Sequence, residues 1–301
     1  MGRRPAIRGG GTAGEPLRRI ARGVLGEARA AIEDGNRSEA DAVHEFRKAM
    51  KRWRALLRLL EPFLGESGRR LRLQARDLAR ELARPRDAQS ALDGLQDALR
   101  RDAEFSPRSL QAIRGRLEEV RQKAETAMLT TVVRGRMTAA IRGAARAVDR
   151  WPVTEIGFTD LTDRLTETYR RARRMIPDEW SDAAAEDLHE LRRRVIEHRY
   201  QMELVEPLWP RLGKLWVEEA QRLRDRLGRY QDLVVLSGLA APHQLLAPWR
   251  SRLSRPIAAR QAVHLTAAAR LAGRLFAERP KAFRRRLRAM WEARAKPGGQ
   301  D

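Results

Sequence analysis

A segment of this chain recurs 145 residues further on, and this repeat limits the folds that the chain can adopt. Residues 43–64 match residues 188–209 without a gap. The same offset still pairs Asp87 with Asp232, so one register holds from residue 43 to residue 87. We interpret the repeat as a tandem duplication; a chance match between two helices rich in Arg and Leu is the alternative. The matched pairs include His44/His189, Glu45/Glu190, Arg47/Arg192, Arg54/Arg199, Leu59/Leu204, Glu61/Glu206 and Pro62/Pro207.

The stretch from Trp151 to Gly157 is the best candidate for a linker in the middle of the chain, because proline and glycine interrupt it. It predicts a first half at 15–150 and a second half at 151–295. Residues 1–14 are interpreted as a flexible N-terminal arm and residues 296–301 as a flexible tail. Two duplicated halves are expected to face each other, so residues that are used twice should converge on a shared groove or tunnel.

The fold class is predicted to be all-α, because Ala, Leu, Arg and Glu dominate and no sustained β-branched alternation occurs. The segment 107–148 is too long for one straight helix in a compact domain, and Thr130–Val133 is its weakest helical stretch. Proline and glycine set the other boundaries. The predicted helices are 16–33, 38–61, 66–83, 86–102, 107–148, 159–176, 181–206, 209–228, 231–239, 243–253, 256–278 and 280–294.

The charge balance is extreme. A formal net charge of +22 points to a polyanionic partner, which can be nucleic acid, polyphosphate or an anionic membrane surface. Hydrophobic residues make up 42% of the chain, which is enough for a folded core. The absence of cysteine excludes disulfides and thiolate chemistry. No apolar run approaches the roughly 18 residues of a membrane span, and no signal peptide is evident, so we expect a cytoplasmic protein.

Basic side chains follow one side of the first copy. At about 100° per residue, five ionisable residues share a band of about 80°, whereas Phe46, Met50, Trp53, Leu57 and Leu60 form the opposite, apolar face. Like charges at this spacing repel one another, so the band is expected to hold an anion chain; an ordinary solvated face is the alternative. The band consists of His44, Arg47, Lys51, Arg54 and Arg58.

The second copy carries a weaker version of this band, with Ile196 in place of Lys51 and Glu203 in place of Arg58. Further cations flank the band of the first copy, so the first half is expected to dominate binding. The remaining candidate binding residues are Arg52, Arg69, Arg70, Arg72, Arg76 and Arg86 in the first half, and His189, Arg192, Arg193 and Arg199 in the second.

Several kinds of chemistry lack support in the sequence. His44-Glu45 and His189-Glu190 begin like a zincin helix, but the second histidine of that motif is missing. No nucleophile motif and no phosphate-binding loop appear, so we expect neither an enzyme nor a bound cofactor or metal. Nonspecific binding of DNA or RNA stays open, because phosphate backbones attract cations of any origin. The basic segment 276–291 is interpreted as a capping helix, with a membrane-surface helix or a second polyanion contact as alternatives.

The run His44 to Leu57 resembles the opening helix of the CHAD (conserved histidine α-helical domain) family, and His189-Glu190-Leu191-Arg192 resembles its second copy. Arg86-Asp87 and Gln231-Asp232 are similar to turns of that family. The resemblance covers about residues 15–290 and implies two four-helix-bundle-like halves around a basic central groove or cavity. It also implies binding of inorganic polyphosphate in a cavity lined by His44 and His189, and association with polyphosphate granules in some members. No Glu-x-Glu-x-Lys motif of the companion triphosphate-tunnel domain occurs, so a stand-alone member is expected.

Overall fold

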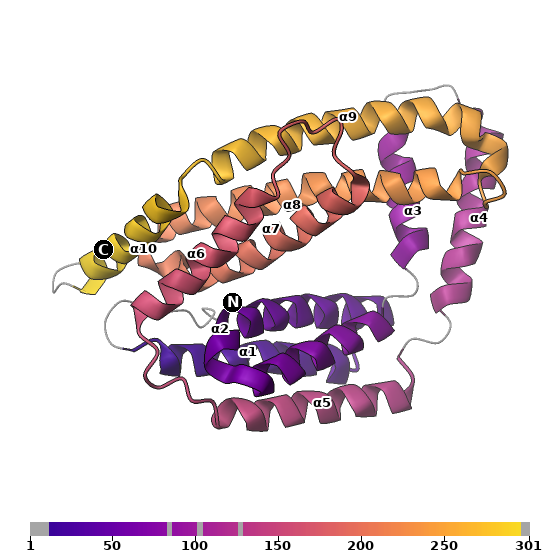
Figure 1. Ribbon diagram of the computed structural model, residues 1–301. Helices are drawn as coiled ribbons and strands as arrows, with labels where there is room; N and C mark the ends of the chain where they lie inside the picture. Colours follow the sequence, from indigo (N-terminus) through magenta and orange to yellow (C-terminus); the bar gives the residue numbers. More distant parts are fainter. Residues whose placement is uncertain (1–11, 83–85, 101–104, 126–128, 296–301) are drawn as a thin grey trace.

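A computed structural model describes residues 12–82, 86–100, 105–125 and 129–295, and every regular element within these ranges is helical (Figure 1). The prediction of an all-α fold is thereby confirmed. Two short 3₁₀ turns, Glu206–Leu208 and Ala247–Trp249, flank the long helix α8. The α-helices are α1 (Gly14–Glu33), α2 (Glu39–Glu81), α3 (Arg86–Ala98), α4 (Pro107–Glu125), α5 (Thr131–Asp149), α6 (Phe158–Arg174), α7 (Ala185–Val205), α8 (Pro210–Leu239), α9 (Arg250–Leu275) and α10 (Pro280–Ala295).

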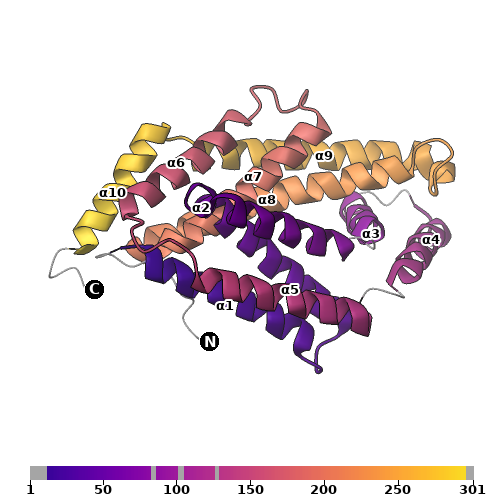
Figure 2. The ribbon, with the colours of Figure 1, turned by 60° about the horizontal axis from the view of Figure 1, so that its bottom comes forward.

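The helices form two layers, which contact each other mainly through α2 and α7. Helices α1, α2 and α5 pack together, and α6 to α10 lie above them in Figure 1. Figure 2 shows α2 between the layer of α7 and α8 and the pair α1 and α5, in agreement with the packing of α2 against α7. The first helix begins at Gly14, inside the predicted arm, while residues 1–11 and 296–301 lie outside the described part of the chain.

Helix α2 buries the apolar face that its periodicity predicts. Phe46, Met50, Trp53 and Leu57 are all at most 2% exposed, and each such side chain contributes about 1.5–3 kcal/mol when it leaves water. The hydroxyl of Ser38 caps the helix by accepting a hydrogen bond from the Asp41 amide at 3.1 Å. This packing fixes the rotation of α2 and therefore the direction in which its basic band points.

A sharp change of direction divides α2 at Gly65, where φ is 53° and ψ is −137°. Only glycine adopts this region without strain, because it lacks a Cβ atom. The sequence predicts two helices here, 38–61 and 66–83, and the structure places the break between them. We call residues 39–64 the first segment and residues 66–81 the second segment of α2. The turn lets two stretches of the same helix bring their cations to one place.

Other boundaries agree with the sequence only in part. The expected bend near Thr130 is a break, since α4 ends at Glu125 and α5 begins at Thr131 with the Thr130 hydroxyl as its cap. The prediction of two helices over 209–239 is wrong, because α8 runs through Gly228 without interruption. Glycine inside a helix costs only about 1 kcal/mol, and the packing of α8 against α3, α7 and α9 outweighs that cost. Likewise, α9 continues through the buried Pro256 although two helices are predicted there.

Helix α3, from the predicted first half, packs against α8 and α9 from the predicted second half, and α4 packs against α3. Their contact is a separate hydrophobic cluster that includes Leu95, Leu117 and Leu236. Gly94 permits the close approach, because a Cβ atom there would lie 2.7 Å from the carbonyl oxygen of Asp232. The helices of the two predicted halves are therefore interleaved at this end of the molecule. The duplication itself and the division at residue 150 stay predictions.

Candidate functional site

The first segment of α2 meets α7 through a reciprocal pair of ion pairs. Arg58 donates a hydrogen bond to the carboxylate of Glu197, and Arg52 lies 3.8 Å from that of Glu203. Under the 145-residue offset, Glu197 corresponds to Arg52 and Glu203 corresponds to Arg58. Position 58 thus contacts the counterpart of position 52, and position 52 contacts the counterpart of position 58. Such an exchange is expected when two related helices cross about a twofold axis.

The crossing point lies close to Ala55. The side-chain amide of Gln201 on α7 donates a hydrogen bond to the Ala55 carbonyl oxygen at 3.2 Å, and Gln201 is only 1% exposed. Since this contact is buried, it fixes how the two helices cross. The crossing places the basic side of the first segment of α2 beside the N-terminal part of α7.

Arg54 is the centre of a cluster of arginines beside this crossing. Burial, and then the charges of four other arginines, lower the pKa of the Arg54 guanidinium to about 10. Those four residues are Arg58, Arg193, Arg72 and Arg76, named in order of their effect. They come from both segments of α2 and from α7, so the Gly65 turn and the helix crossing together assemble the cluster. We call these five residues the Arg54 cluster.

Arg54 differs from its neighbours in having no carboxylate within ion-pair distance among the described residues. Its buried Nε atom also makes no hydrogen bond to the described part of the protein. A partly buried cation that is surrounded by like charges is costly in the free protein. An oxyanion at this position would relieve both the repulsion and the unsatisfied donor.

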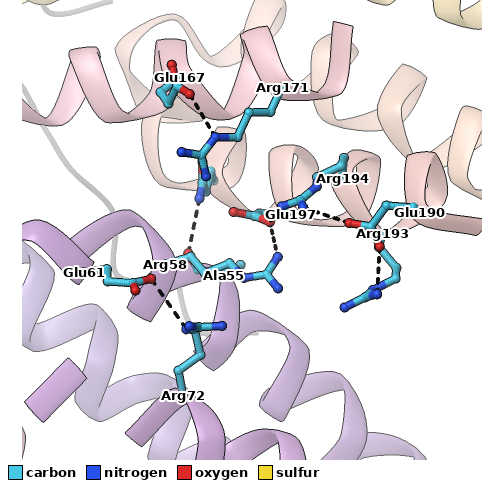
Figure 3. A network of polar contacts seen from close by, with 11 residues as sticks. Ala55, Arg58, Glu61, Arg72, Glu167, Arg171, Glu190, Arg193, Arg194 and Glu197 are labelled. Atoms are coloured by element: carbon cyan, nitrogen blue, oxygen red, sulfur yellow. Dashed lines mark hydrogen bonds and ion pairs between the residues drawn. The ribbon is translucent and has the colours of Figure 1, made fainter. Parts of the chain in front are cut away.

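The other four members are paired with acids, as Figure 3 shows for Arg58, Arg72 and Arg193. Arg72 lies 3.5 Å from Glu61, Arg76 lies 2.9 Å from Asp77, and Arg193 lies 2.7 Å from Glu190. Acids of the protein therefore compensate part of the positive charge of the cluster, but none of the described acids pairs with Arg54.

The structure places the other candidate residues of the first half around this cluster or away from it. Arg47 donates a hydrogen bond to the Leu82 carbonyl oxygen at 2.7 Å, which closes the end of the second segment of α2. Arg52 is half-buried between Glu27 and Glu203. His44, Arg69 and Arg70 are exposed, and Lys51 is half-buried. The side chain of Arg86 lies outside the described residues.

Among the candidate residues of the second half, Arg192, Arg199 and His189 are all at least partly buried. Arg192 is 8% exposed and its guanidinium packs over Gly228. Arg199 stacks on the ring of Tyr200 and pairs with Glu203 at 3.0 Å. His189 is half-buried. Of the second-half candidates, Arg193 alone appears among the charges that act on Arg54.

The ion pairs that acids make at the site were not predicted from the sequence, where Glu197 and Glu203 count only as departures from the basic pattern. Glu197 bridges Arg58 and Arg194, and Glu190 bridges Arg193 and Arg194. The signal lies in the repeat, where Arg52 aligns with Glu197 and Arg58 with Glu203. An inversion of charge at two matched positions indicates ion pairing between the copies, provided that the helices are known to cross.

In the parts of the chain that the structure describes, no three His, Asp or Glu side chains form a group that could hold a metal ion. His198 accepts a hydrogen bond from the Trp216 indole at 3.0 Å, and His264 lies 2.6 Å from Asp97. Within the same described ranges, none of the helices is both long and apolar enough to cross a membrane.

These features define a class of protein, an all-helical module in which two crossing helices and a kinked segment gather arginines. The CHAD domain matches residues 19–241, and the chain belongs to the CHAD domain family. The family is associated in general with polyphosphate binding. The chain is also similar to the crystal structure of the CHAD domain from the plant Ricinus communis, at 19% sequence identity and a TM-score of 0.59. The likeness covers 97% of this chain and 95% of that one. No curated protein sequence matches the chain.

Proposed function

We infer that this protein binds inorganic polyphosphate at the Arg54 cluster. The observation that supports this function best is the environment of Arg54, a partly buried guanidinium among four other arginines, with no carboxylate partner within the described ranges. Membership of the CHAD domain family favours polyphosphate over other polyanions. The reciprocal crossing of α2 and α7 supports a duplicated origin and a binding surface that both copies share.

Binding occurs by exchange of counterions. The phosphate oxygens of the polymer replace small anions near the cluster, and arginine can hold them with two parallel N–H donors. Arg54 and Arg58 are one helical turn apart, about 6 Å along the axis, a spacing that suits neighbouring phosphates of one chain. The protein acts as a binding module without catalysis, and in the cell it associates with polyphosphate granules.

A competition experiment tests this function against nonspecific nucleic-acid binding. Long-chain polyphosphate, duplex DNA and RNA are compared at matched phosphate concentration and moderate salt, with fluorescence anisotropy as the readout. A preference for polyphosphate of about tenfold or more, which corresponds to about 1.4 kcal/mol, supports the proposed function. Equal affinities for the three polymers would favour the nucleic-acid alternative, and no binding of polyphosphate would overturn the proposal.

A further inference from the structure

The cationic site contains an acid of its own. Glu197 projects from α7 between Arg58 of α2 and Arg194 of α7, and its side chain is only 9% exposed (Figure 3). It accepts a hydrogen bond from Arg58 and lies 3.6 Å from Arg194. Arg58 is also the arginine whose charge acts most strongly on Arg54. Glu197 therefore occupies a position beside the cluster where a phosphate would otherwise find donors.

We propose that Glu197 is an internal counter-anion that sets the affinity of the site by withholding Arg58 and Arg194 from the bound polyanion. The proposal rests on polyphosphate binding at the Arg54 cluster. In this proposal, one acidic residue determines how many cations of the site can contact the polymer. Arg54 then serves as the first contact, and Arg58 joins only when the polymer displaces the carboxylate.

Two physical effects of Glu197 act in opposite directions. In the free protein the carboxylate relieves repulsion between Arg58 and its cationic neighbours, which stabilises the fold. In the complex the same carboxylate repels phosphate and competes for the guanidinium donors. Removal of its charge should therefore lower the stability of the free protein and strengthen the binding of polyanions. A residue that only holds the fold together would produce the first effect without the second.

The salt dependence of binding reports the number of cations engaged. For a single-stranded polyanion, the slope of log K against log salt concentration steepens by about 0.7 for each additional contact with a phosphate. Release of Arg58 and Arg194 would accordingly steepen the slope by about 0.7 to 1.4. This readout separates a change in the number of contacts from a general gain or loss of folded protein.

The test compares the wild-type chain with Glu197→Gln, using long-chain polyphosphate and a series of sodium chloride concentrations. Glutamine keeps the shape and an acceptor oxygen but removes the charge. We expect a dissociation constant at least about threefold lower at moderate salt, together with the steeper slope. An unchanged slope, or weaker binding by a folded variant, would overturn the proposal. If the wild-type chain itself fails to bind polyphosphate, the proposed function falls instead.

Glu219→Gln is the matched control. Glu219 also lies between two arginines, at 2.9 Å from Arg222 of its own helix and 3.3 Å from Arg274 of another helix. It has no part in the Arg54 cluster, so its replacement should leave the slope unchanged. A steeper slope in this control as well would mean that any lost acid strengthens binding, and the specific role of Glu197 would be refuted.

Arg58→Gln keeps the proposal testable if Glu197→Gln does not fold. Because Glu197 occupies Arg58 in the wild-type protein, this variant should weaken polyphosphate binding by less than about threefold. A loss as large as that of Arg54→Ala would show that Arg58 is already engaged by the polymer, which contradicts the proposal. Where both variants fold, Arg58→Gln should cancel the gain produced by Glu197→Gln.

Discussion

At the scale of single residues, Arg54 illustrates how a binding site can oppose the stability of its own fold. Its charge is partly buried and repelled by Arg58, Arg193, Arg72 and Arg76, and the structure provides no acid beside it within the described ranges. Such an arrangement raises the free energy of the folded state without ligand and lowers it once an anion is present. Binding and folding thus make opposite demands on the same side chain.

Replacement of Arg54 by alanine should therefore separate the two properties. We expect a loss of affinity for polyphosphate of about tenfold or more, because a charge-assisted hydrogen bond is worth about 1.5–3 kcal/mol. The melting temperature of the free protein should stay equal to that of the wild type or rise. Fluorescence anisotropy and circular dichroism measure the two effects. Arg29→Ala, which removes an exposed arginine paired with Glu33 on α1, is the control.

A second prediction at the scale of residues concerns His198 and its contribution to stability. Complete burial, and then the charge of Arg286, lower the pKa of this histidine from 6.5 to about 3. The imidazole is surrounded by Tyr169, Phe276 and Trp216, and its Nε2 atom accepts a hydrogen bond. Since the unfolded chain takes up the proton first, the contribution of His198 is complete above pH 6.5 and is lost progressively as the pH falls toward 3.

By pH 5.5 this single group should remove about 1.4 kcal/mol from the free energy of unfolding. His198→Gln keeps an acceptor for Trp216 but cannot be protonated, so its stability should fall less between pH 8 and pH 5.5. Urea denaturation at several pH values measures the difference. His44→Gln, which replaces an exposed histidine, is the control. Parallel pH profiles for the wild type and His198→Gln would show that His198 is not the group responsible.

At the scale of helices, the Gly65 turn joins the two segments of α2 that supply most of the Arg54 cluster. Gly65→Ala should cost about 1–3 kcal/mol, because an L-residue is strained at φ 53° and ψ −137°. The second segment should also be displaced, which moves Arg72 and Arg76 away from Arg54 and weakens polyphosphate binding. Thermal denaturation and the binding titration measure the two effects.

Gly26→Ala is the control for this substitution. Gly26 lies on the exposed side of α1, where a Cβ atom would meet nothing within 4 Å. Alanine there should be neutral or stabilising by about 0.5–1 kcal/mol. If Gly65→Ala behaved in the same way, the turn would not be needed to hold the cluster together.

Helices also show how far the sequence determines this molecule. The apolar face of Phe46 and Trp53 and the break near Thr130 follow from local periodicity and propensity, because they depend on neighbours in the chain. Continuity of α8 through Gly228 does not follow, since it depends on the packing of α8 against α3, α7 and α9, which outweighs the low helix propensity of glycine. The basic band was predictable in the same local sense. The pairing of Glu197 with Arg58 was not, because it depends on the angle at which two distant helices cross.

At the scale of the whole molecule, a buried charge network holds α3 to α8 and α9. Asp97 of α3 accepts hydrogen bonds from Arg260 at 2.9 Å and from His264 at 2.6 Å, both on α9. Burial raises the pKa of Asp97, but these hydrogen bonds outweigh burial and hold the pKa below its usual value. The Nδ1 atom of His264 faces a guanidinium nitrogen of Arg226 on α8 at 3.4 Å. The network lies where the helices of the two predicted halves are interleaved.

Asp97→Ala should loosen this end of the protein. Removal of the acid leaves Arg260 and His264 without their acceptor, which costs about 3 kcal/mol for a buried pair. We expect a lower melting temperature and faster hydrogen exchange in α3, while the region around Arg54 exchanges as before. Asp93→Ala, an exposed position one turn earlier on α3, should change neither. Uniformly faster exchange across the whole chain would show that α3 does not open as a separate unit.

The reciprocal contact between α2 and α7 also bears on how such a chain can change over generations. Glu197 and Glu203 of α7 lie opposite Arg58 and Arg52 of α2, so a change in one helix alone would leave an unmatched charge at the crossing. Among related sequences, loss of the acid at position 197 should accompany loss of the base at position 58. Where the base is kept, we expect a higher affinity for polyphosphate. We therefore expect changes at these two sites to be coupled, because their side chains meet in space although 139 positions separate them along the chain.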